Sequence, residues 1–296
     1  MEITVIVPTY NRVDSLKQCL QALQQQTLPA HQYEVLVVDD GSTDGTARYL
    51  RELATRWPAF RFFSQANAGP AAARNKGIAA ARGRVIAFTD DDCIPQENWL
   101  EVIHTTFQTT NSVGLQGSTY TDRQDITPLT HQIDNEQGNS SVPTCNAAFT
   151  RAALLQINGF DEQFPYPHNE DADLAWRIEQ LGDITFVSAM RLYHPPRLDS
   201  FAKVAKRMKI MESEFRLFFR NRAAYQRKRA SSPWKNIYWE IGVKTLGYYL
   251  LSRLKYYRQP KLMIQGMALT LIWGFDLLRR FPQFVKSERE QRRLCA

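Results

Sequence analysis

The sequence predicts an α/β protein with a mostly parallel central sheet, and two observations carry that prediction. First, short apolar runs of strand type alternate with segments of helical spacing over the first 90 residues. Second, each apolar run ends abruptly in polar or turn-forming residues. Alternating strands and helices form βαβ units, which give a parallel sheet with helices on both faces.

The expected elements follow one another in order along the chain. Residues 14–26 carry apolar side chains at helical spacing, and either Asp14 or Ser15 can cap that helix. A second helix is expected over 43–53, and an Ala-rich third helix follows the Gly-Pro turn at 69–70. The strands around these helices are ITVIV (3–7), EVLVV (34–38), RFFSQ (61–65) and VIAFT (85–89).

Polar segments follow the ends of these strands, namely PTYN, DDGS, NAGP and DDD. In a parallel sheet the carboxyl ends of the strands share one edge, and ligands bind there. We therefore expect the four segments to converge on one site. Neither a GxGxxG motif nor a Walker A loop follows the first strand, so a Rossmann dehydrogenase and a P-loop enzyme are disfavoured.

Asp90, Asp91 and Asp92 end the fourth expected strand and repel one another. Without a glycine-rich phosphate cradle, a phosphate ligand needs another source of positive charge, and a divalent metal held by carboxylates supplies it. We expect this metal, rather than protein side chains, to neutralise the three acids. The alternative is a solvated acidic turn.

Charge is distributed unevenly along this chain of net charge +7. Residues 1–200 hold 15 Lys and Arg against 24 Asp and Glu, whereas residues 201–296 hold 22 against 6, so we place a domain boundary near 194–200. Residues 116–144 are polar and weakly patterned, which predicts a long connecting or acceptor-facing loop. Four isolated cysteines and an N-terminus without a signal-peptide pattern favour reduced thiols in the cytoplasm, without zinc or disulfides.

Five motifs occur in a fixed order: VIVPTYNR, VVDDGSTDGT, NAGPAAARNKG, FTDDDCIP and NEDADLAWRIEQLG. In order and spacing they resemble the motifs of family 2 glycosyltransferases of the GT-A fold, over roughly residues 3–200. The resemblance implies a Rossmann-like sheet with a nucleotide-sugar-binding half (1–95) and an acceptor-binding half (96–200). It also implies an inverting, metal-dependent transferase.

The resemblance implies roles for residues on the donor side. Pro8, Thr9 and Tyr10 correspond to the segment that contacts the nucleotide base and ribose. Asp40 corresponds to a carboxylate that accepts a hydrogen bond from the base, which fits uracil, and Arg74 corresponds to a basic residue near the donor. The alternatives are that Tyr10 only packs, that Asp40 forms a turn and that Arg74 is a helix-surface arginine.

The same resemblance implies a metal site. Asp90 and Asp92 correspond to the two ends of a DxD motif, which would hold Mn²⁺ or Mg²⁺ against the donor diphosphate, with Asp92 as the first choice. Asp90 or Asp91 would reach the ribose or a metal-bound water. His194, after the strand-like run FVSAMRLY, would be the third ligand; His168 competes for this role, and a packing role is the alternative. Such a metal acts as a Lewis acid on the leaving nucleoside diphosphate.

On the acceptor side, Asp171 in NEDAD corresponds to the catalytic base, which would take the proton from an acceptor hydroxyl in a single displacement with inversion. Glu170, a candidate substrate contact, and Asp173 would raise the pKa of this base by repulsion. The alternative is a helix start capped by Asn169. Asn146 in CNAAF, a strand whose small residues leave room for a sugar, is a further candidate substrate contact.

Residues 201–296 predict a basic helical section. Residues 201–229 place apolar side chains at helical spacing, with ten basic residues against two acids, as in an amphipathic helix. Apolar, aromatic segments follow at 237–257 and 262–275, the second shorter than the roughly 20 residues that span a membrane. We expect attachment to an anionic membrane surface. Packing on the catalytic domain or a homo-oligomer is the alternative, and no motif supports nucleic acid binding.

The sequence therefore predicts a glycosyltransferase that moves a sugar from a nucleotide-sugar, preferably UDP-linked, to a hydroxyl of a glycan or lipid-linked acceptor. The expected setting is cell-surface polysaccharide or glycolipid synthesis, in the cytoplasm and peripheral to the inner face of the cell membrane. One rival is a sugar-phosphate nucleotidyltransferase, which PTYNR disfavours because a glycine-rich loop is expected there. The other is a non-catalytic scaffold, which the intact DDD and NEDAD segments disfavour.

Overall fold

The computed structural model describes residues 1–122 and 127–295, apart from the side chains of residues 206–208. The chain divides into two compact units. Unit 1 consists of Met1–Thr121, Ile133–Gln163 and Glu170–Pro195, and unit 2 consists of Asp122–Gln132, Phe164–Asn169 and Pro196–Ala296. Two internal segments therefore group with the C-terminal helices, a division that the composition of the sequence does not reveal.

Unit 1 is built around an eight-stranded sheet. Its strands are β1 (Ile3–Thr9), β2 (Tyr33–Asp39), β3 (Phe60–Ser64), β4 (Val85–Phe88), β5 (Ile94–Pro95), β6 (Gly114–Tyr120), β8 (Ala147–Thr150) and β9 (Ile184–Tyr193). They lie in the order β3-β2-β1-β4-β8-β6-β9-β5. The first four strands are parallel and β6 is parallel to β9, whereas β8 and β5 are antiparallel to their neighbours. This mixed, mostly parallel sheet confirms the predicted fold class.

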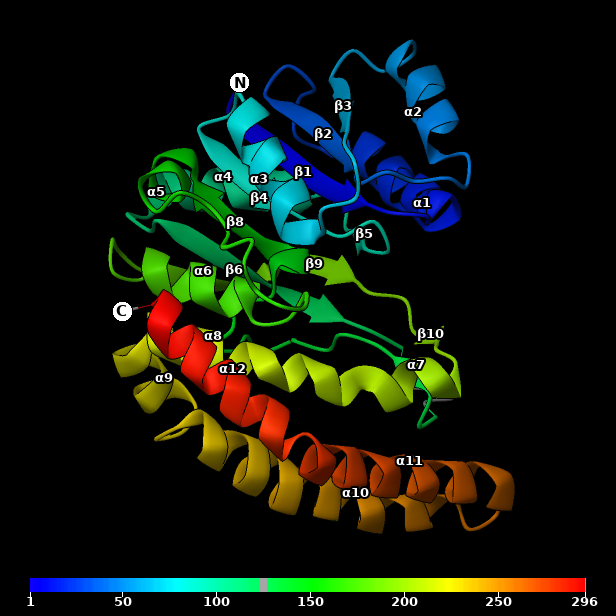
Figure 1. Cartoon of the computed structure of the whole chain (residues 1–296). Helices are drawn as coiled ribbons and strands as arrows, with labels where there is room; N and C mark the ends of the chain where they lie inside the picture. The colour runs from blue at the N-terminus through cyan, green and yellow to red at the C-terminus, as the bar shows by residue number, and fades with distance from the viewer. Residues whose placement is uncertain (123–126, 296) are drawn as a thin grey trace. The chain divides into compact units, whose positions relative to one another are not determined.

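Helices surround this sheet (Figure 1). They are α1 (Val13–Gln24), α2 (Thr46–Ala54), α3 (Pro70–Ala80), α4 (Trp99–Thr109), the 3-10 turn η1 (Thr144–Asn146), α5 (Arg151–Gln156) and α6 (Glu170–Ile178). The apolar face predicted for α1 is buried against β1 and β2 in the main core of the unit. Burial of this face, rather than intrinsic helix propensity, supplies most of the stability of such a helix.

The strand register brings the polar segments of the sequence to one edge. Thr9 of β1 is level with Asp39 of β2, and Asp39 is level with Ser64 of β3. Backbone hydrogen bonds continue past the strand ends, from the Asp40 N–H to the Thr9 carbonyl at 2.9 Å and from the Gln65 N–H to the Asp39 carbonyl at 2.9 Å. The expected convergence of PTYN, DDGS, NAGP and DDD is therefore confirmed.

The loop predicted over residues 116–144 is partly wrong, because strand β6 covers Gly114–Tyr120. Polar side chains hide the strand pattern of β6, and they form hydrogen bonds inside unit 1. The Gln116 side chain, for example, bonds the backbone of Asn139 through both its amide nitrogen (3.0 Å) and its oxygen (3.0 Å). Hydrophobic periodicity cannot reveal a strand whose buried polar groups are satisfied by distant partners. Residues 123–126 of this segment lie outside the described residues.

Unit 2 is mainly helical, with a short antiparallel pair of strands, β7 (Thr130–His131) and β10 (Arg197–Leu198). Its helical segments are α7 (Phe201–Ala205), η2 (Lys206–Glu212), α8 (Ser213–Arg220), α9 (Arg222–Lys228), η3 (Lys235–Thr245), α10 (Leu246–Ser252), η4 (Arg253–Tyr256), α11 (Pro260–Arg279) and α12 (Phe281–Leu294).

The single amphipathic helix predicted over 201–229 is wrong in two respects. The stretch is divided into α7, η2, α8 and α9, and Asn221, with φ −132°, ends α8. Its apolar side chains Met211, Phe215 and Phe218 are buried, the first two in a cluster with residues of η3, α11 and α12. These side chains form the core of unit 2 and are not available to a membrane.

Candidate active site

Three adjacent carboxylates follow β4, and their partners differ. Arg74 Nη2 donates a hydrogen bond to Asp90 Oδ1 at 2.7 Å. Arg12 Nη1 donates to Asp91 Oδ1 at 3.1 Å and to Asp92 Oδ2 at 2.8 Å. Two arginines therefore neutralise part of the charge, and the expectation that a metal alone does so is wrong.

Asp91 is 4% exposed and is held by residues at the end of β1. Thr9 Oγ1 donates to Asp91 Oδ2 at 2.7 Å, and Arg12 bonds the other oxygen. Burial raises the pKa of Asp91 to about 6; Arg12 opposes this shift, and the charge of Asp92 adds to it. With both oxygens engaged, Asp91 fastens the end of β4 to the end of β1, which does not support the predicted ribose contact.

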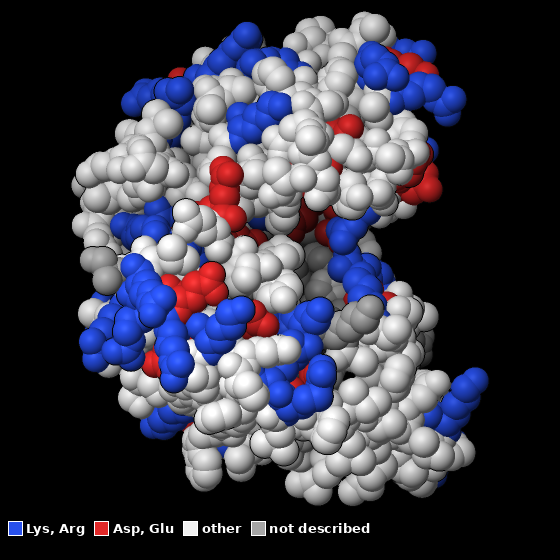
Figure 2. All heavy atoms as spheres, viewed as in Figure 1, with Lys and Arg blue, Asp and Glu red and all other residues white. Residues whose placement is uncertain are grey.

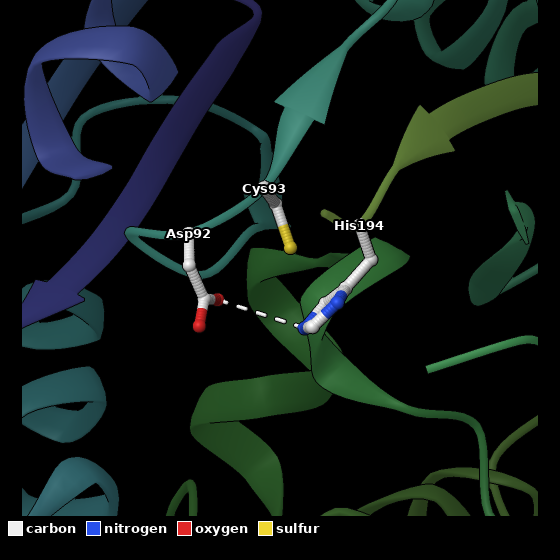
Figure 3. Close-up of side chains that lie close together, drawn as sticks. All are labelled: Asp92, Cys93 and His194. Atoms are coloured by element: carbon white, nitrogen blue, oxygen red, sulfur yellow. Dashed lines mark ion pairs between the residues drawn. The ribbon is translucent and has the colours of Figure 1, made fainter. Parts of the chain in front are cut away.

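A candidate metal group lies beside these acids. The ligand atoms of Asp92, Cys93 and His194 lie within 4.8 Å of one another (Figure 3). Asp92 Oδ1 is 3.7 Å from His194 Nε2. The backbone N–H of His194, just after β9, donates to the Tyr120 carbonyl of β6 at 2.8 Å, which fixes the position of the histidine. The structure therefore brings two of the three predicted metal ligands together.

The remaining predicted ligand, Asp90, is not in this group and pairs with Arg74 instead. Cys93 takes its place, but burial raises the pKa of the Cys93 thiol well above its ordinary value, and neighbouring Cys145 adds to this effect. A neutral thiol is a poor metal ligand, whereas a carboxylate and an imidazole suit Mn²⁺. The competing His168 belongs to unit 2, where burial lowers its pKa to about 4.

Arg74 of α3 links the DDD and NEDAD segments. It is 5% exposed, which excludes a helix-surface arginine. Its Nη2 bonds Asp90, its Nη1 lies 3.6 Å from Glu170 Oε1, and its guanidinium carbon lies 5.6 Å from the centre of the Phe160 ring. Within the part of the chain that the structure describes, buried Nε and Nη1 have no hydrogen-bond partner. Arg74 is therefore a buried cation that joins the two acidic segments.

The acids of NEDAD occupy the first turn of α6 and differ in environment. Burial raises the pKa of Glu170 well above its ordinary value of 4.5, and the charge of Asp171 adds to this shift. Asp171 is less buried, and its Oδ1 accepts a hydrogen bond from the Ala172 N–H at 2.9 Å. Asp173 is fully buried and accepts a hydrogen bond from Arg177 Nε at 2.8 Å. Burial, with added repulsion from Asp171, therefore raises the pKa of Glu170, and a raised pKa of Asp171 stays a prediction.

Asp40 holds the loop between β3 and α3. Its Oδ1 accepts hydrogen bonds from Gln65 Nε2 at 2.8 Å and from the Ala68 N–H at 2.9 Å. Its Oδ2 accepts a hydrogen bond from the Gly69 N–H at 2.8 Å, and Asn67 Nδ2 donates to its carbonyl at 3.2 Å. Both residues therefore shape the NAGP loop, which fits the turn-forming alternative for Asp40, and a contact of Asp40 with uracil stays a prediction.

The PTYNR segment contains one residue, Arg12, whose role its sequence context does not predict. Pro8 and Thr9 are buried in β1, so that only Tyr10 of the predicted three, at 47% exposed, presents an open side chain. Arg12 received no predicted role, yet it pairs with two of the three acids. The sequence signal for Arg12 was a cation at the expected ligand edge. Its partner Asp91 lies 79 residues further along the chain, so local patterns do not pair the two.

Asn146 is a structural residue rather than an open substrate contact. It is 1% exposed, and its Nδ2 donates to the carbonyls of Ser118 at 3.0 Å and Met190 at 3.1 Å. Trp99 Nε1 donates to its Oδ1 at 2.8 Å. The amide therefore ties β6, β9 and α4 together, and it does not support the predicted sugar contact.

A mixed sheet with acids, a buried arginine and the NEDAD helix at one edge is typical of GT-A glycosyltransferases. The fold and the site therefore define this class of protein. The sequence profile described as Glycosyl transferase family 2 matches residues 4–170. The chain therefore belongs to glycosyl transferase family 2 and is a transferase. Glycosyltransferase AglE of Haloferax volcanii is 30% identical over 243 residues, which cover 78% of this chain and 79% of AglE.

Solved structures share the fold. Staphylococcus aureus TarS 1–349 in complex with UDP-GlcNAc has a TM-score of 0.60 and 16% identity, covering 96% of this chain and 92% of that chain. Mannosyltransferase PcManGT from Pyrobaculum calidifontis, in complex with GDP-Man and Mn²⁺, has a TM-score of 0.60 and 20% identity, covering 98% and 86%. One neighbour holds a uridine nucleotide and the other a guanosine nucleotide, so the fold by itself does not select the base.

Proposed function

We propose that the chain transfers a sugar from a UDP-sugar to a hydroxyl group of a glycan or lipid-linked acceptor, with a divalent metal and with inversion. The proposed setting is cell-surface polysaccharide or glycolipid synthesis. The observation that carries the proposal is Arg74, which is buried between Asp90 and Glu170 with two nitrogens that no described residue bonds. Buried donors of this kind are costly unless a ligand accepts their hydrogen bonds, and a diphosphate does so strongly.

Asp92 and His194 are the residues that would hold the divalent ion, since their oxygen and nitrogen donors suit it and lie 3.7 Å apart. Such an ion, when bound, stabilises the negative charge that develops on a leaving diphosphate. Arg12 and Arg74 contribute fixed positive charge on the same group of acids. The Mn²⁺ in the PcManGT complex supports this assignment by similarity.

Asp171 is the proposed general base. The acceptor oxygen forms a bond to the anomeric carbon while the bond from that carbon to the diphosphate oxygen breaks, and the acceptor proton passes to the Asp171 carboxylate. A single displacement of this kind inverts the anomeric centre. Glu170, whose pKa is raised by burial and by the charge of Asp171, lies next to this base in the first turn of α6.

Uracil is the proposed base, as the resemblance of Asp40 to a base-contacting carboxylate implies. Tyr10 presents an exposed aromatic ring beside the end of β1, which suits stacking with a nucleotide base. Among the structural neighbours, TarS holds UDP-GlcNAc and PcManGT holds GDP-Man, so the base has to be measured. Release of nucleoside diphosphate across a panel of nucleotide-sugars, with Mn²⁺ present, tests this choice directly, and we expect UDP-sugars to be the preferred donors.

The decisive variant is Asp171→Asn. We expect the turnover number for sugar transfer to a verified acceptor to fall about 10²- to 10⁴-fold, because a general base contributes that much, with UDP affinity unchanged. Asp14→Asn on α1, whose side chain is 88% exposed, is the matched control and should keep full activity. Near wild-type transfer by Asp171→Asn would exclude the proposed mechanism.

Two further measurements separate the rival functions. Pyrophosphate released from a nucleoside triphosphate and a sugar phosphate would indicate a nucleotidyltransferase. Calorimetry with UDP, in the presence and absence of Mn²⁺, tests the scaffold. Absence of binding to any nucleoside diphosphate under both conditions would favour a non-catalytic protein.

A further inference from the structure

Unit 2 exposes an unusual amount of apolar surface. Of the twenty large apolar side chains that are exposed within the described residues, thirteen lie between Trp239 and Phe281. In Figure 2 the lower surface, where Figure 1 places α10 and α11, is mostly free of Lys, Arg, Asp and Glu. Contiguous apolar surface of this kind marks a binding surface for a protein partner or a membrane.

The exposed side chains of α11 form a stripe along one face. They are Ile264, Leu271, Phe275 and Leu278, spaced seven, four and three residues apart, and each is more than 60% exposed. These spacings place all four on the same side of a helix. We call them the α11 stripe. The helix thus presents a continuous apolar edge along much of its length.

The antiparallel partner of α11 presents a second stripe. Trp239, Val243, Leu251 and Leu254 lie on η3, α10 and η4 and are all exposed, and we call them the α10 stripe. They recur at intervals of about four residues, with Gly247 at the intervening position. Segments η3, α10 and η4 all contact α11, so the two stripes belong to one helical hairpin.

The opposite side of this hairpin is fixed within unit 2. Leu269 and Leu277 of α11 are buried, and Tyr238 Oη donates to the Leu277 carbonyl at 3.1 Å. Trp273 Nε1 donates to the Val204 carbonyl of α7 at 2.8 Å. A helix that is packed on one side against its own unit has only its outer face available to a membrane or a partner protein.

By length and composition alone, α11 is long and apolar enough to cross a membrane, and only 22% of its most apolar window is buried. Crossing would require the helix to leave the contacts that Trp273 and Leu277 make within unit 2. Lys261 lies in its first turn and Arg279 in its last. Its packed inner face and open outer face instead match a helix that lies in the plane of an interface.

The charge around the two stripes favours an anionic surface. Residues 235–280 hold eight Lys and Arg against two acids, Glu240 and Asp276. Both acids are already paired, Glu240 with Lys244 and Asp276 with Arg279 and Arg280. A second copy of this face would therefore bring cations against cations, whereas anionic headgroups attract them. Exposed tryptophan and tyrosine side chains also suit a membrane–water interface.

We propose that the α11 and α10 stripes insert into the surface of an anionic lipid bilayer, with the exposed cations Lys255, Arg258 and Lys261 on its headgroups. This corrects the sequence-based expectation, which assigned the attachment to residues 201–229 as well. The inference depends on unit 2 alone, so it stands or falls independently of the proposed transferase chemistry.

Sedimentation of the full chain with phosphatidylcholine vesicles, with and without phosphatidylglycerol, tests the proposal. We expect binding to the anionic vesicles that weakens as salt is added. Leu271→Glu/Phe275→Glu should lower vesicle affinity by about tenfold or more, because two inserted apolar side chains are lost. Leu155→Glu/Phe186→Glu replaces exposed apolar residues of unit 1 and is the matched control, with binding unchanged.

A charge variant gives an independent result. Lys255→Gln/Arg258→Gln/Lys261→Gln should reduce affinity for anionic vesicles on the order of a hundredfold, with circular dichroism and UDP binding unchanged. Failure of the wild-type chain to bind anionic vesicles, or unchanged binding by either variant, would overturn the proposal. A stable dimer in solution that Leu271→Glu/Phe275→Glu dissociates would overturn it in favour of a second copy as the occupant.

Discussion

The buried acid Glu214 of unit 2 and the three DDD acids of unit 1 are compensated in opposite ways. In unit 2, Glu214 is 1% exposed and accepts hydrogen bonds from Tyr225 Oη at 2.7 Å, Asn169 Nδ2 at 2.9 Å, Asn236 Nδ2 at 3.0 Å and Arg229 Nη1. Burial favours its neutral form, but Arg229 and these hydrogen bonds outweigh burial and hold the pKa of Glu214 below its ordinary value.

In unit 1, the DDD acids share two arginines, but there the partners of Asp91 do not outweigh its burial. Asp91 has a pKa raised to about 6, because burial and the neighbouring acids outweigh Arg12 and Thr9. Arg74, for its part, keeps two nitrogens without a described hydrogen-bond partner. The difference teaches that the partners of Glu214 stabilise its charged form, whereas the partners of Asp91 do not outweigh its burial and the repulsion of its neighbours. Perturbed, unsatisfied groups of this kind are typical of functional sites.

The largest expected effect comes from removing the satisfied acid. Glu214→Ala should destabilise unit 2 by about 3–5 kcal/mol, because Arg229 and the other donors lose a buried partner. Hydrogen exchange of the α8 and α9 amides, in the full chain, measures this loss. Asp14→Ala on the surface of unit 1 is the control. A change below about 1 kcal/mol would mean that Glu214 and the DDD acids do not differ as described.

Asp92→Asn should lower ligand affinity rather than stability. We expect the affinity for UDP in the presence of Mn²⁺ to fall about tenfold or more, because a charged ligand of the proposed metal group is lost. The free energy of unfolding should stay the same or rise, because one of three repelling charges is removed. Calorimetry and urea unfolding of the same preparation check both parts. Equal UDP affinity with and without Mn²⁺ in the wild type would refute the metal assignment.

The two groups should also differ in the pH dependence of stability. Because the folded pKa of Glu214 lies below its ordinary value of 4.5, Glu214 contributes stability that is present above this value and lost as the pH falls below it. We therefore expect Glu214→Gln to lower the stability of unit 2 most at neutral pH, and the difference from the wild type to shrink in acid. Hydrogen exchange at several pH values measures it, and a constant difference would contradict this sign.

The smallest expected effect is that of Asp91→Asn. Its pKa is raised, and Arg12 retains Asp92 as a partner after the change. We expect the free energy of unfolding to change by about 1 kcal/mol or less. Urea unfolding compares this variant with Glu214→Gln, which replaces an equally buried acid. A larger loss for Asp91→Asn than for Glu214→Gln would reverse the comparison.

Much of unit 1 could be predicted from local patterns. The runs ITVIV and EVLVV gave β1 and β2 within two residues at each end, because buried parallel strands consist of continuous apolar residues. The polar strand β6 and the broken stretch at 201–229 could not be predicted in this way. Their side chains are satisfied by partners far away in the sequence, such as Asn139 for Gln116.

The sequence by itself determined the alternation of strands and helices, the edge at which the motifs meet and the family, because each depends on short runs and their order. Only the tertiary structure decided which charges compensate one another. Arg12 and Arg74 pair with the DDD acids, His194 lies beside Asp92, and Asn146 is buried with its amide bonded to the sheet. It also decided which apolar residues of unit 2 form a core and which stay exposed. Pairing and burial depend on distance in space, which local sequence patterns do not contain.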